Sequence, residues 1–191
     1  MNIAAFLTYI IVTAITPGPN NITAMSNGIR IGFIKGLRYN YGVFAGQLCV
    51  VTICGIFSAV LAASIPSIKP YLLVLGAGYM LYLAYKTYHS NGVQVYDNVS
   101  GTFLSGFSLQ FINPKYIIYS ITAMSSYILP NYTSFAIIVP LGILLAFTGF
   151  ACTILWSAFG SLFVKVYAAH AKLLNTIMAL LLVYCAVALF L

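Results

Sequence analysis

The sequence predicts an all-α membrane protein whose six transmembrane helices form two inverted three-helix repeats. Composition is the first reason: 62% of the residues are apolar, 5% are charged and the mean hydropathy is +1.04, which a water-facing globule cannot accommodate. The second reason is a pair of proline-containing polar motifs, at 16–20 and 113–115, each inside a long apolar stretch. Each half of the chain carries one of them. Broken helices occur at membrane depth only where the freed backbone groups line a cavity enclosed by protein.

A transmembrane helix needs about 20 predominantly apolar residues. The third of the expected spans is the weakest, since its charge-free part is short and Lys86 must extend from its end to the interface. The fifth is longer than a bilayer requires, which predicts either a tilt or a break near Pro140. The connections leave no room for a soluble domain, so we expect one domain over 1–191, with halves at about 1–95 and 96–191. The six expected spans are 3–25, 40–63, 70–88, 103–127, 135–164 and 173–191.

The first span contains the motif Thr16-Pro17-Gly18-Pro19-Asn20. This span has no basic residues before its apolar run and no small-residue cleavage site, so it is predicted to be a retained helix rather than a signal peptide. The two prolines remove backbone hydrogen bonds, and the glycine permits conformations closed to other residues. We therefore expect two half-helices that meet near the bilayer midplane.

The fourth span contains the second motif, with Gln110, Asn113, Pro114, Lys115 and Tyr119 as candidate binding residues. Lys115 is the only ionisable side chain well inside a predicted span. A charge at the bilayer centre costs about 2.5–3.5 kcal/mol on insertion scales, so a functional role is the default expectation. Two roles remain open: binding a substrate carboxylate, or holding Asn113 and neighbouring carbonyls together. In either case the two halves of a broken helix offer carbonyls to an ammonium group and N–H groups to a carboxylate.

Charged and metal-binding residues are scarce. Asp97 is the only acidic residue, and the four cysteines and two histidines lack metal-ligand spacing; we expect no catalytic residues, no metal and no cofactor. The net charge of +7 is not clustered on a soluble face, so nucleic acid is not an expected partner. The expected partners are the lipid bilayer and a small zwitterionic solute.

Basic residues predict the orientation, because connections rich in Lys and Arg stay in the cytoplasm. Lys69 lies on the opposite side from the others, so both termini are predicted to face outward and the two halves to be inverted copies. A repeated segment agrees with this: Ile-Thr-Ala-Met-Ser follows both breaks, at 22–26 and 121–125, as a relic of duplication, a shared packing demand or a chance match. The predicted cytoplasmic residues are Arg30, Lys35, Arg38, Lys86, Lys165 and Lys172.

Glycines at 28, 32, 36, 42 and 46 have the small-xxx-small spacing that allows helices to approach closely. Close helix packing is one interpretation, and a hinge between moving halves is the other. Such surfaces permit a homodimer without requiring one.

Four motifs together resemble the LysE/RhtB family of bacterial amino-acid exporters, over essentially the whole chain. The resemblance implies a transporter in the bacterial inner membrane that exports small amino acids and their derivatives. The motifs are the 16–20 segment, Gly28-x-Arg30-x-Gly32-x-x-x-Gly36, Gly78-Tyr79-x-x-Tyr82-Leu83 and Gln110-x-x-Asn113-Pro114-Lys115.

Within that family the second half is similar to members that export cysteine and O-acetylserine, mainly at 109–115, 122–130 and 179–187. This similarity makes those two solutes the first prediction, with homoserine and threonine next. A small-solute channel or a lipid-handling membrane protein is the alternative. The sequence contains no constellation of catalytic groups, so an enzyme is not expected. The coupling ion stays open, since only Lys115, tyrosines or the substrate could titrate at depth.

Overall fold

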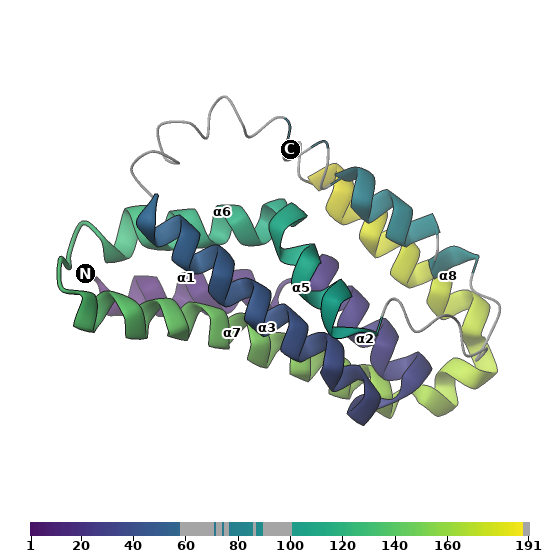
Figure 1. The fold of residues 1–191 in the computed structure, drawn as a ribbon. Helices are drawn as coiled ribbons and strands as arrows, with labels where there is room; N and C mark the ends of the chain where they lie inside the picture. Colours follow the sequence, from purple (N-terminus) through teal and green to yellow (C-terminus); the bar gives the residue numbers. More distant parts are fainter. Residues whose placement is uncertain (58–70, 72–73, 75–76, 86, 90–100, 189–191) are drawn as a thin grey trace.

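The computed structural model describes residues 1–57, 71, 74, 77–85, 87–89 and 101–188, and these residues are helical with short connections and no strand (Figure 1). The all-α prediction is confirmed for this part of the chain. Residues 77–85 form a further helical stretch beside α8. The helices are α1 (Ile3–Ile15), α2 (Pro19–Ile31), α3 (Phe33–Ile56), α5 (Phe103–Ile112), α6 (Pro114–Thr122), the π-helix η1 (Ala123–Ile128), α7 (Phe135–Leu162) and α8 (Val164–Ala188).

Both helix breaks lie at the predicted motifs. α1 ends before Thr16 and α2 begins at Pro19, with a bend of 48° between the two helices. α5 ends before Asn113, and α6 begins at Pro114. Proline is favoured as the first residue of a helix, because its fixed φ suits the helix and its missing N–H would have had no partner there. The prolines therefore start the second half-helices as well as ending the first.

The apolar helices agree with a membrane protein. α3 and α7 are each long and apolar enough to cross a bilayer, and the bent pair α1 and α2 would be a third span if it counts as one. The expected third span, 70–88, is described only in part, at 71, 74, 77–85, 87 and 88, and Lys69, Lys86 and Asp97 lie outside the described residues. The six-span inverted arrangement therefore stays a prediction.

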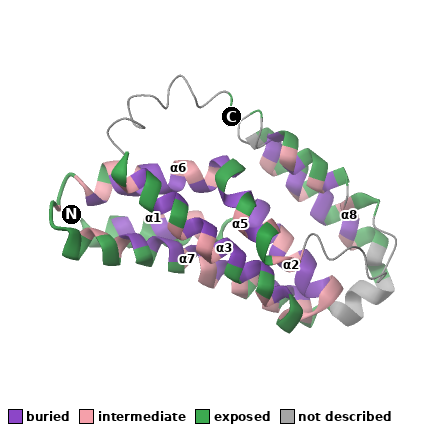
Figure 2. Ribbon diagram, viewed as in Figure 1, coloured by how far each residue is buried: buried purple, intermediate pink, exposed green. Residues whose placement is uncertain are grey.

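The predicted connection from 26 to 39 is wrong. α2 continues to Ile31 and α3 begins at Phe33, so Gly32 alone joins them, with a φ of 81° that favours glycine. Hydropathy failed here because α2 is rich in polar residues. Those residues are nevertheless mostly buried against neighbouring helices (Figure 2), so they do not need water.

Two further boundaries differ from expectation. α7 runs unbroken through Pro140, so the predicted alternative of a break there is wrong. α8 begins at Val164, before the expected sixth span, and has a kink at His170, whose φ and ψ of −133° and 35° are not helical. The apolar helix after the kink, Lys172–Val187, agrees with the expected span 173–191. Of the basic residues that suggested a loop, Lys165 therefore lies in the first part of α8, and Lys172 begins the part after the kink.

Glycines let the helices touch backbone to backbone. A Cβ on Gly42 or Gly106 would stand 2.0 Å from the Phe103 carbonyl oxygen or 2.2 Å from that of Tyr39, so α3 and α5 are in direct contact. α2 and α7 also touch backbone to backbone. A Cβ on Gly28 would stand 2.1 Å from the Ser157 carbonyl oxygen, and one on Gly160 would stand 2.2 Å from that of Met25. The packing interpretation of the glycines is confirmed at Gly28 and Gly42.

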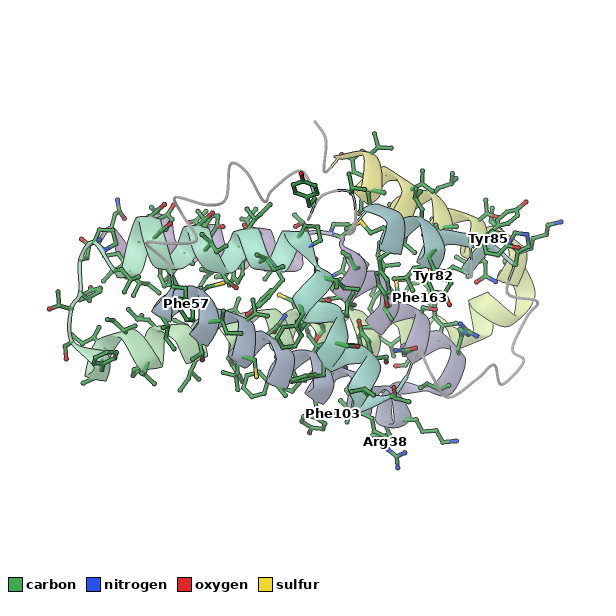
Figure 3. All side chains as sticks on the ribbon, turned by 45° about the horizontal axis from the view of Figure 1, so that its top comes forward. Arg38, Phe57, Tyr82, Tyr85, Phe103 and Phe163 are labelled. Carbon is green, nitrogen blue, oxygen red and sulfur yellow. The ribbon has the colours of Figure 1, made fainter. Side chains whose placement is uncertain are left out.

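Apolar side chains cover the outside of the bundle. Ile11 and Val12 of α1 and Leu155 of α7 are more than half exposed, which in water would leave a large apolar surface unsatisfied. In a membrane these side chains face lipid. Arg38 and Phe103 lie at the same end of the bundle, and Phe57 lies toward the other (Figure 3).

Gly106→Ala should destabilise the protein, because the new methyl group would meet the Tyr39 carbonyl and force α3 and α5 apart. Overpacking of this kind costs roughly 1–3 kcal/mol. The detergent-purified variant should unfold at a lower temperature than the wild type. Gly78→Ala is the matched control, since a Cβ there meets nothing within 4 Å; equal unfolding temperatures for the two variants would contradict the packing.

Candidate functional site

The two helix breaks lie against each other, and Lys115 joins them. Its Nζ donates to the Thr16 carbonyl oxygen at 2.8 Å, to the Thr16 hydroxyl at 2.8 Å and to the Pro17 carbonyl oxygen at 3.3 Å. The lysine follows the proline that begins α6, so one break supplies the cation and the other supplies the oxygen atoms. A charge inside the bundle is thereby paired with backbone dipoles.

Other side chains satisfy the remaining carbonyls at the end of α1. The Asn21 amide donates to the carbonyl oxygens of Ala14 and Thr16 at 2.8 and 2.9 Å, and the Trp156 indole donates to that of Ile15 at 3.2 Å. Carbonyl groups at a helix end need such partners where water is absent. The first break is therefore held by residues from α2, α6 and α7.

A buried cluster of amides connects α2 with the second break. Asn20 and Gln110 exchange two hydrogen bonds, of 2.8 and 3.1 Å, and the Asn113 amide donates to the Asn20 oxygen at 3.1 Å. Gln110 also donates to the Gly106 carbonyl oxygen at 2.8 Å. Each of the three side chains is at least nine-tenths buried. The cluster fixes the start of α2 against the end of α5.

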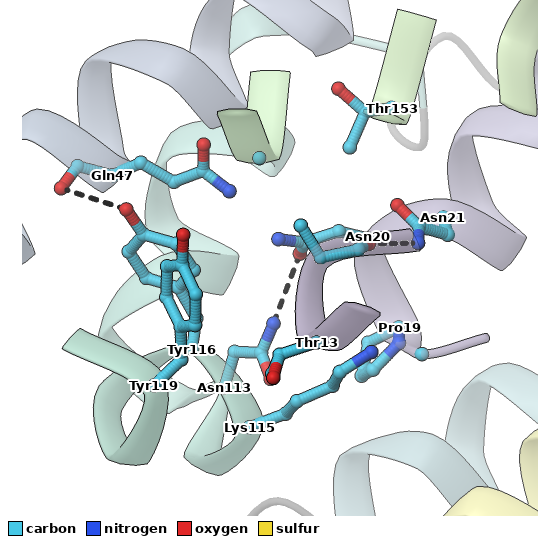
Figure 4. A pocket seen from close by; sticks show the side chains of 13 residues that line it. Thr13, Pro19, Asn20, Asn21, Gln47, Asn113, Lys115, Tyr116, Tyr119 and Thr153 are labelled. Carbon is cyan, nitrogen blue, oxygen red and sulfur yellow. Dashed lines mark hydrogen bonds between the residues drawn. The ribbon is translucent and has the colours of Figure 1, made fainter. Parts of the chain in front are cut away.

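A small cavity of about 30 Å³ lies where the breaks meet (Figure 4). Its wall combines polar side chains from α2, α3, α6 and α7 with two tyrosines. Asn113 extends toward Asn20, and Lys115 extends toward Pro19. We call it the central cavity. Its lining residues are Thr13, Ala14, Gly18, Pro19, Asn20, Asn21, Gln47, Asn113, Lys115, Tyr116, Tyr119, Gly149 and Thr153.

Two helix N-termini open into the central cavity. α2 begins after Gly18 and α6 after Asn113, and neither of these capping residues forms a side-chain hydrogen bond to its helix. Pro19 and Pro114, the first residues of the two helices, have no N–H, so the N–H groups of the residues that follow carry the partial positive charge that binds anions. With the Lys115 ammonium beside them, they can receive a carboxylate.

The opposite requirement, an acceptor for a cation, is met by amide oxygens. Gln47 Oε1 and Asn113 Oδ1 are buried and have no hydrogen-bond partner within the described structure. Tyr116 and Tyr119 stand beside them with ring centroids 5.4 Å apart. Amide oxygens and aromatic faces attract an ammonium group without any acidic residue. The central cavity therefore contains groups for both ends of a zwitterion.

The structure brings most of the predicted site residues together. Gly18, Pro19, Asn20, Asn113, Lys115 and Tyr119 line the central cavity. Thr16 and Pro17 bind Lys115, Gln110 binds Asn20, and Pro114 begins α6.

Sequence reasoning left several lining residues out of the site. Gln47 and Tyr116 were visible as polar or aromatic side chains at depth, but no motif marks them. Gly149 and Thr153 gave no signal, since both lie in an apolar helix with no break nearby. Their position depends on the way α7 packs beside α2 and α3.

Comparison with known proteins gives the family. The model of the LysE type translocator family matches residues 11–191, nearly the whole chain. The chain belongs to the LysE family. Membership in this family indicates a membrane transporter for amino-acid export rather than an enzyme, in agreement with the apolar helices.

Full-length relatives carry a more specific name. The chain is 40% identical to the cysteine/O-acetylserine efflux protein of Salmonella paratyphi A, with 100% of this chain and 98% of the relative covered. It is 38% identical to the protein of that name in Escherichia coli K12, with 98% and 97% covered. No solved structure matches the chain.

Asn20→Leu should destabilise the protein, because Gln110 and Asn113 would lose their partner in a buried place. Each unsatisfied buried group costs about 1–3 kcal/mol. Adding Gln110→Leu should recover part of the unfolding temperature, since two apolar side chains replace a reciprocal pair. Thermal unfolding of the single and double variants measures this. If the unfolding temperature of the double variant fell by the sum of the decreases in the two single variants, the pairing would be contradicted.

Proposed function

We propose that this LysE-family member is a secondary transporter that exports small neutral amino acids or their derivatives from the cytoplasm. Cysteine and O-acetylserine are the first candidate substrates, and homoserine and threonine follow. The observation that carries the proposal is the central cavity, around which groups suited to a carboxylate and groups suited to an ammonium ion come together. The names of the full-length relatives support the choice of substrates.

The substrate carboxylate is proposed to bind at the N-termini of α2 and α6 beside Lys115. The Lys115 ammonium already has three oxygen partners, so its contacts support the structural role left open by the sequence, with the carbonyls of the first break as its main partners. Its positive charge still faces the central cavity, which Lys115 lines. We propose that one cation serves both purposes, holding the breaks together and attracting the carboxylate.

The substrate ammonium is proposed to bind Gln47 and Asn113 near the tyrosine rings. Dicationic amino acids should be poor substrates, because a second positive charge would lie near Lys115 and no acidic residue lines the central cavity. The alternative, a small-solute channel or lipid-handling protein, shares the broken helices. Such a protein does not need one group that binds a carboxylate beside another that binds an ammonium ion. Its flux would be neither saturable nor stereoselective.

We propose the inner (plasma) membrane of a bacterium as the location, with six spans in two inverted repeats and both termini outside. The two breaks support a repeat, since each lies after an apolar half-helix and before a proline. Exposed Lys35 and Arg38 at the start of α3 would then face the cytoplasm. A homodimer is compatible with the exposed apolar faces.

A reporter enzyme that is active only outside the cytoplasm should be active when fused after Leu191. The excess of basic residues in alternate connections is the reason. Activity per amount of fused protein in whole cells is the measurement, and a fusion at Gly32, the joint between α2 and α3 that we propose to be cytoplasmic, is the control that should be silent. An inactive terminal fusion in well-expressed protein would reject the topology.

Lys115→Met should abolish most of the export while leaving the protein in the membrane. The variant removes the cation in the central cavity. It also removes the three hydrogen bonds that this one charged group donates, each worth about 1.5–3 kcal/mol. The measurement is mass spectrometry of the medium over time, following cysteine, O-acetylserine, homoserine, threonine and lysine. Wild-type cells should accumulate one or more of the neutral solutes selectively.

Lys172→Met is the matched control, since it removes an exposed lysine of α8. It should export like the wild type. Unchanged export by Lys115→Met would reject the role of Lys115. Clear export of lysine by the purified protein in liposomes would contradict the proposed selectivity.

A further inference from the structure

A line of buried polar residues continues from the central cavity between α2, α3 and α7. We call it the polar seam. None of its members is needed to satisfy the helix breaks, and the central cavity includes only the first two. The polar seam consists of Gln47, Thr153, Asn40, Ser157, Gly36 and Asn27.

Contacts at both ends define the course of the polar seam. A Cβ on Gly149 would stand 2.7 Å from the Gln47 amide, so Gln47 of α3 packs against α7 beside the central cavity. A Cβ on Gly36 would stand 3.2 Å from the Ser157 hydroxyl and 3.8 Å from Asn27. Gly36 therefore lies where α2, α3 and α7 meet, close to the end of α2.

Helical spacing connects the two ends. On α3, Asn40 is four residues after Gly36 and seven before Gln47, so the three share a face. On α7, Thr153 is four residues before Ser157 and four after Gly149. The polar positions of both helices thus continue from the central cavity toward the end of the bundle where Lys35 and Arg38 are exposed.

Several polar groups of the seam lack partners in this conformation. Both amide atoms of Asn40, the Ser157 hydroxyl and Gln47 Oε1 are buried without a hydrogen bond in the described structure, and Asn40 and Ser157 are wholly inaccessible to solvent. Such groups are costly in a closed interior and are hydrogen-bonded in most proteins. A second conformation in which water or solute reaches them would account for their presence.

The surrounding backbone permits that conformation. α2 lies between two joints, the Thr16–Gly18 break with its 48° bend and Gly32 with its positive φ. Its contact with α7 runs through Gly28 and Gly160 against backbone oxygens, so no interlocking side chains hold α2 at those points. Rotation of α2 as a rigid body would separate it from α7 along the polar seam.

We propose that the polar seam is a closed access path, through which a zwitterionic solute moves between the central cavity and the end of the bundle carrying Lys35 and Arg38. The inference rests on the proposed transport function. In the described conformation α2 closes the path, and movement of α2 away from α7 opens it to water. Asn40 and Ser157 would line the open path and hydrogen-bond to passing solute and water.

Thiol accessibility tests the path directly. In a variant that lacks the four native cysteines and still exports, Ser157→Cys should react with a charged, membrane-impermeant methanethiosulfonate roughly tenfold faster than Leu145→Cys, a factor equal to about 1.4 kcal/mol. Leu145 is equally buried but lies in the apolar core. Leu155→Cys, exposed on the lipid side, is the second control and should also react slowly. Modification at Ser157→Cys should stop export.

The outcomes separate this proposal from the proposed function. Export with Ser157→Cys no more reactive than Leu145→Cys would overturn the access path and leave amino-acid export standing. Rapid reaction of Ser157→Cys without amino-acid export would support a hydrated path and reject the substrate class. Absence of both would overturn both.

Asn40→Leu gives an independent test. Replacing an unpartnered buried amide by an apolar side chain should raise the unfolding temperature and, because the closed conformation is favoured, reduce the rate of export severalfold. Thr148→Val is the control, since that hydroxyl donates to Leu144 in its own helix at 2.8 Å, and neither quantity should change much. A lower unfolding temperature or unchanged export for Asn40→Leu would contradict the access path.

Discussion

The structure depends on one constraint: backbone groups freed inside a membrane must find partners within the protein. Two helices stop and restart at proline motifs, and each break releases carbonyl and N–H groups. At the first break the carbonyls are satisfied by Lys115, Asn21 and Trp156, which come from α6, α2 and α7. The breaks must therefore lie together, and the packing of four helices follows from their meeting point. The N-terminal ends of α2 and α6 line the central cavity, where we propose that they bind the substrate carboxylate.

The same constraint explains why α2 is polar and yet buried. Its outer surface is covered by α3, α7 and α8, so its asparagines contact other helices instead of lipid. In contrast, the outer face of α7 is mostly apolar, and its buried polar residues Thr153 and Ser157 lie where it meets α2 and α3. The polar residues of the bundle consequently form a continuous internal region, from the central cavity along the polar seam. A solute that requires polar surroundings can occupy this region without contact with lipid.

The charges of the central cavity differ from those of a site built on acidic residues. Lys115 provides the cation, and the lining contains amide oxygens and tyrosine rings instead of carboxylates. Amide oxygens bind an ammonium group by hydrogen bonds and leave the net charge of the cavity positive. Such a site favours a solute whose own carboxylate balances the lysine, and it disfavours additional positive charge. Selectivity in this proposal therefore follows from Lys115 and the absence of acidic residues in the lining.

The sequence by itself determined the helical class, the membrane environment, both breaks and most residues around them, because composition and proline act locally and need no knowledge of packing. It failed where a tertiary contact decides the outcome. Arg30 and Lys35 suggested a loop, yet both are in helices joined at Gly32, because neighbouring helices cover the polar face of α2. Gly149, Thr153 and Asn40 carry no local signal, and only the meeting of α2, α3 and α7 brings them to the central cavity or the polar seam. The partner of Lys115 was likewise undecided, since the carbonyls that bind it lie 99 residues away in the chain.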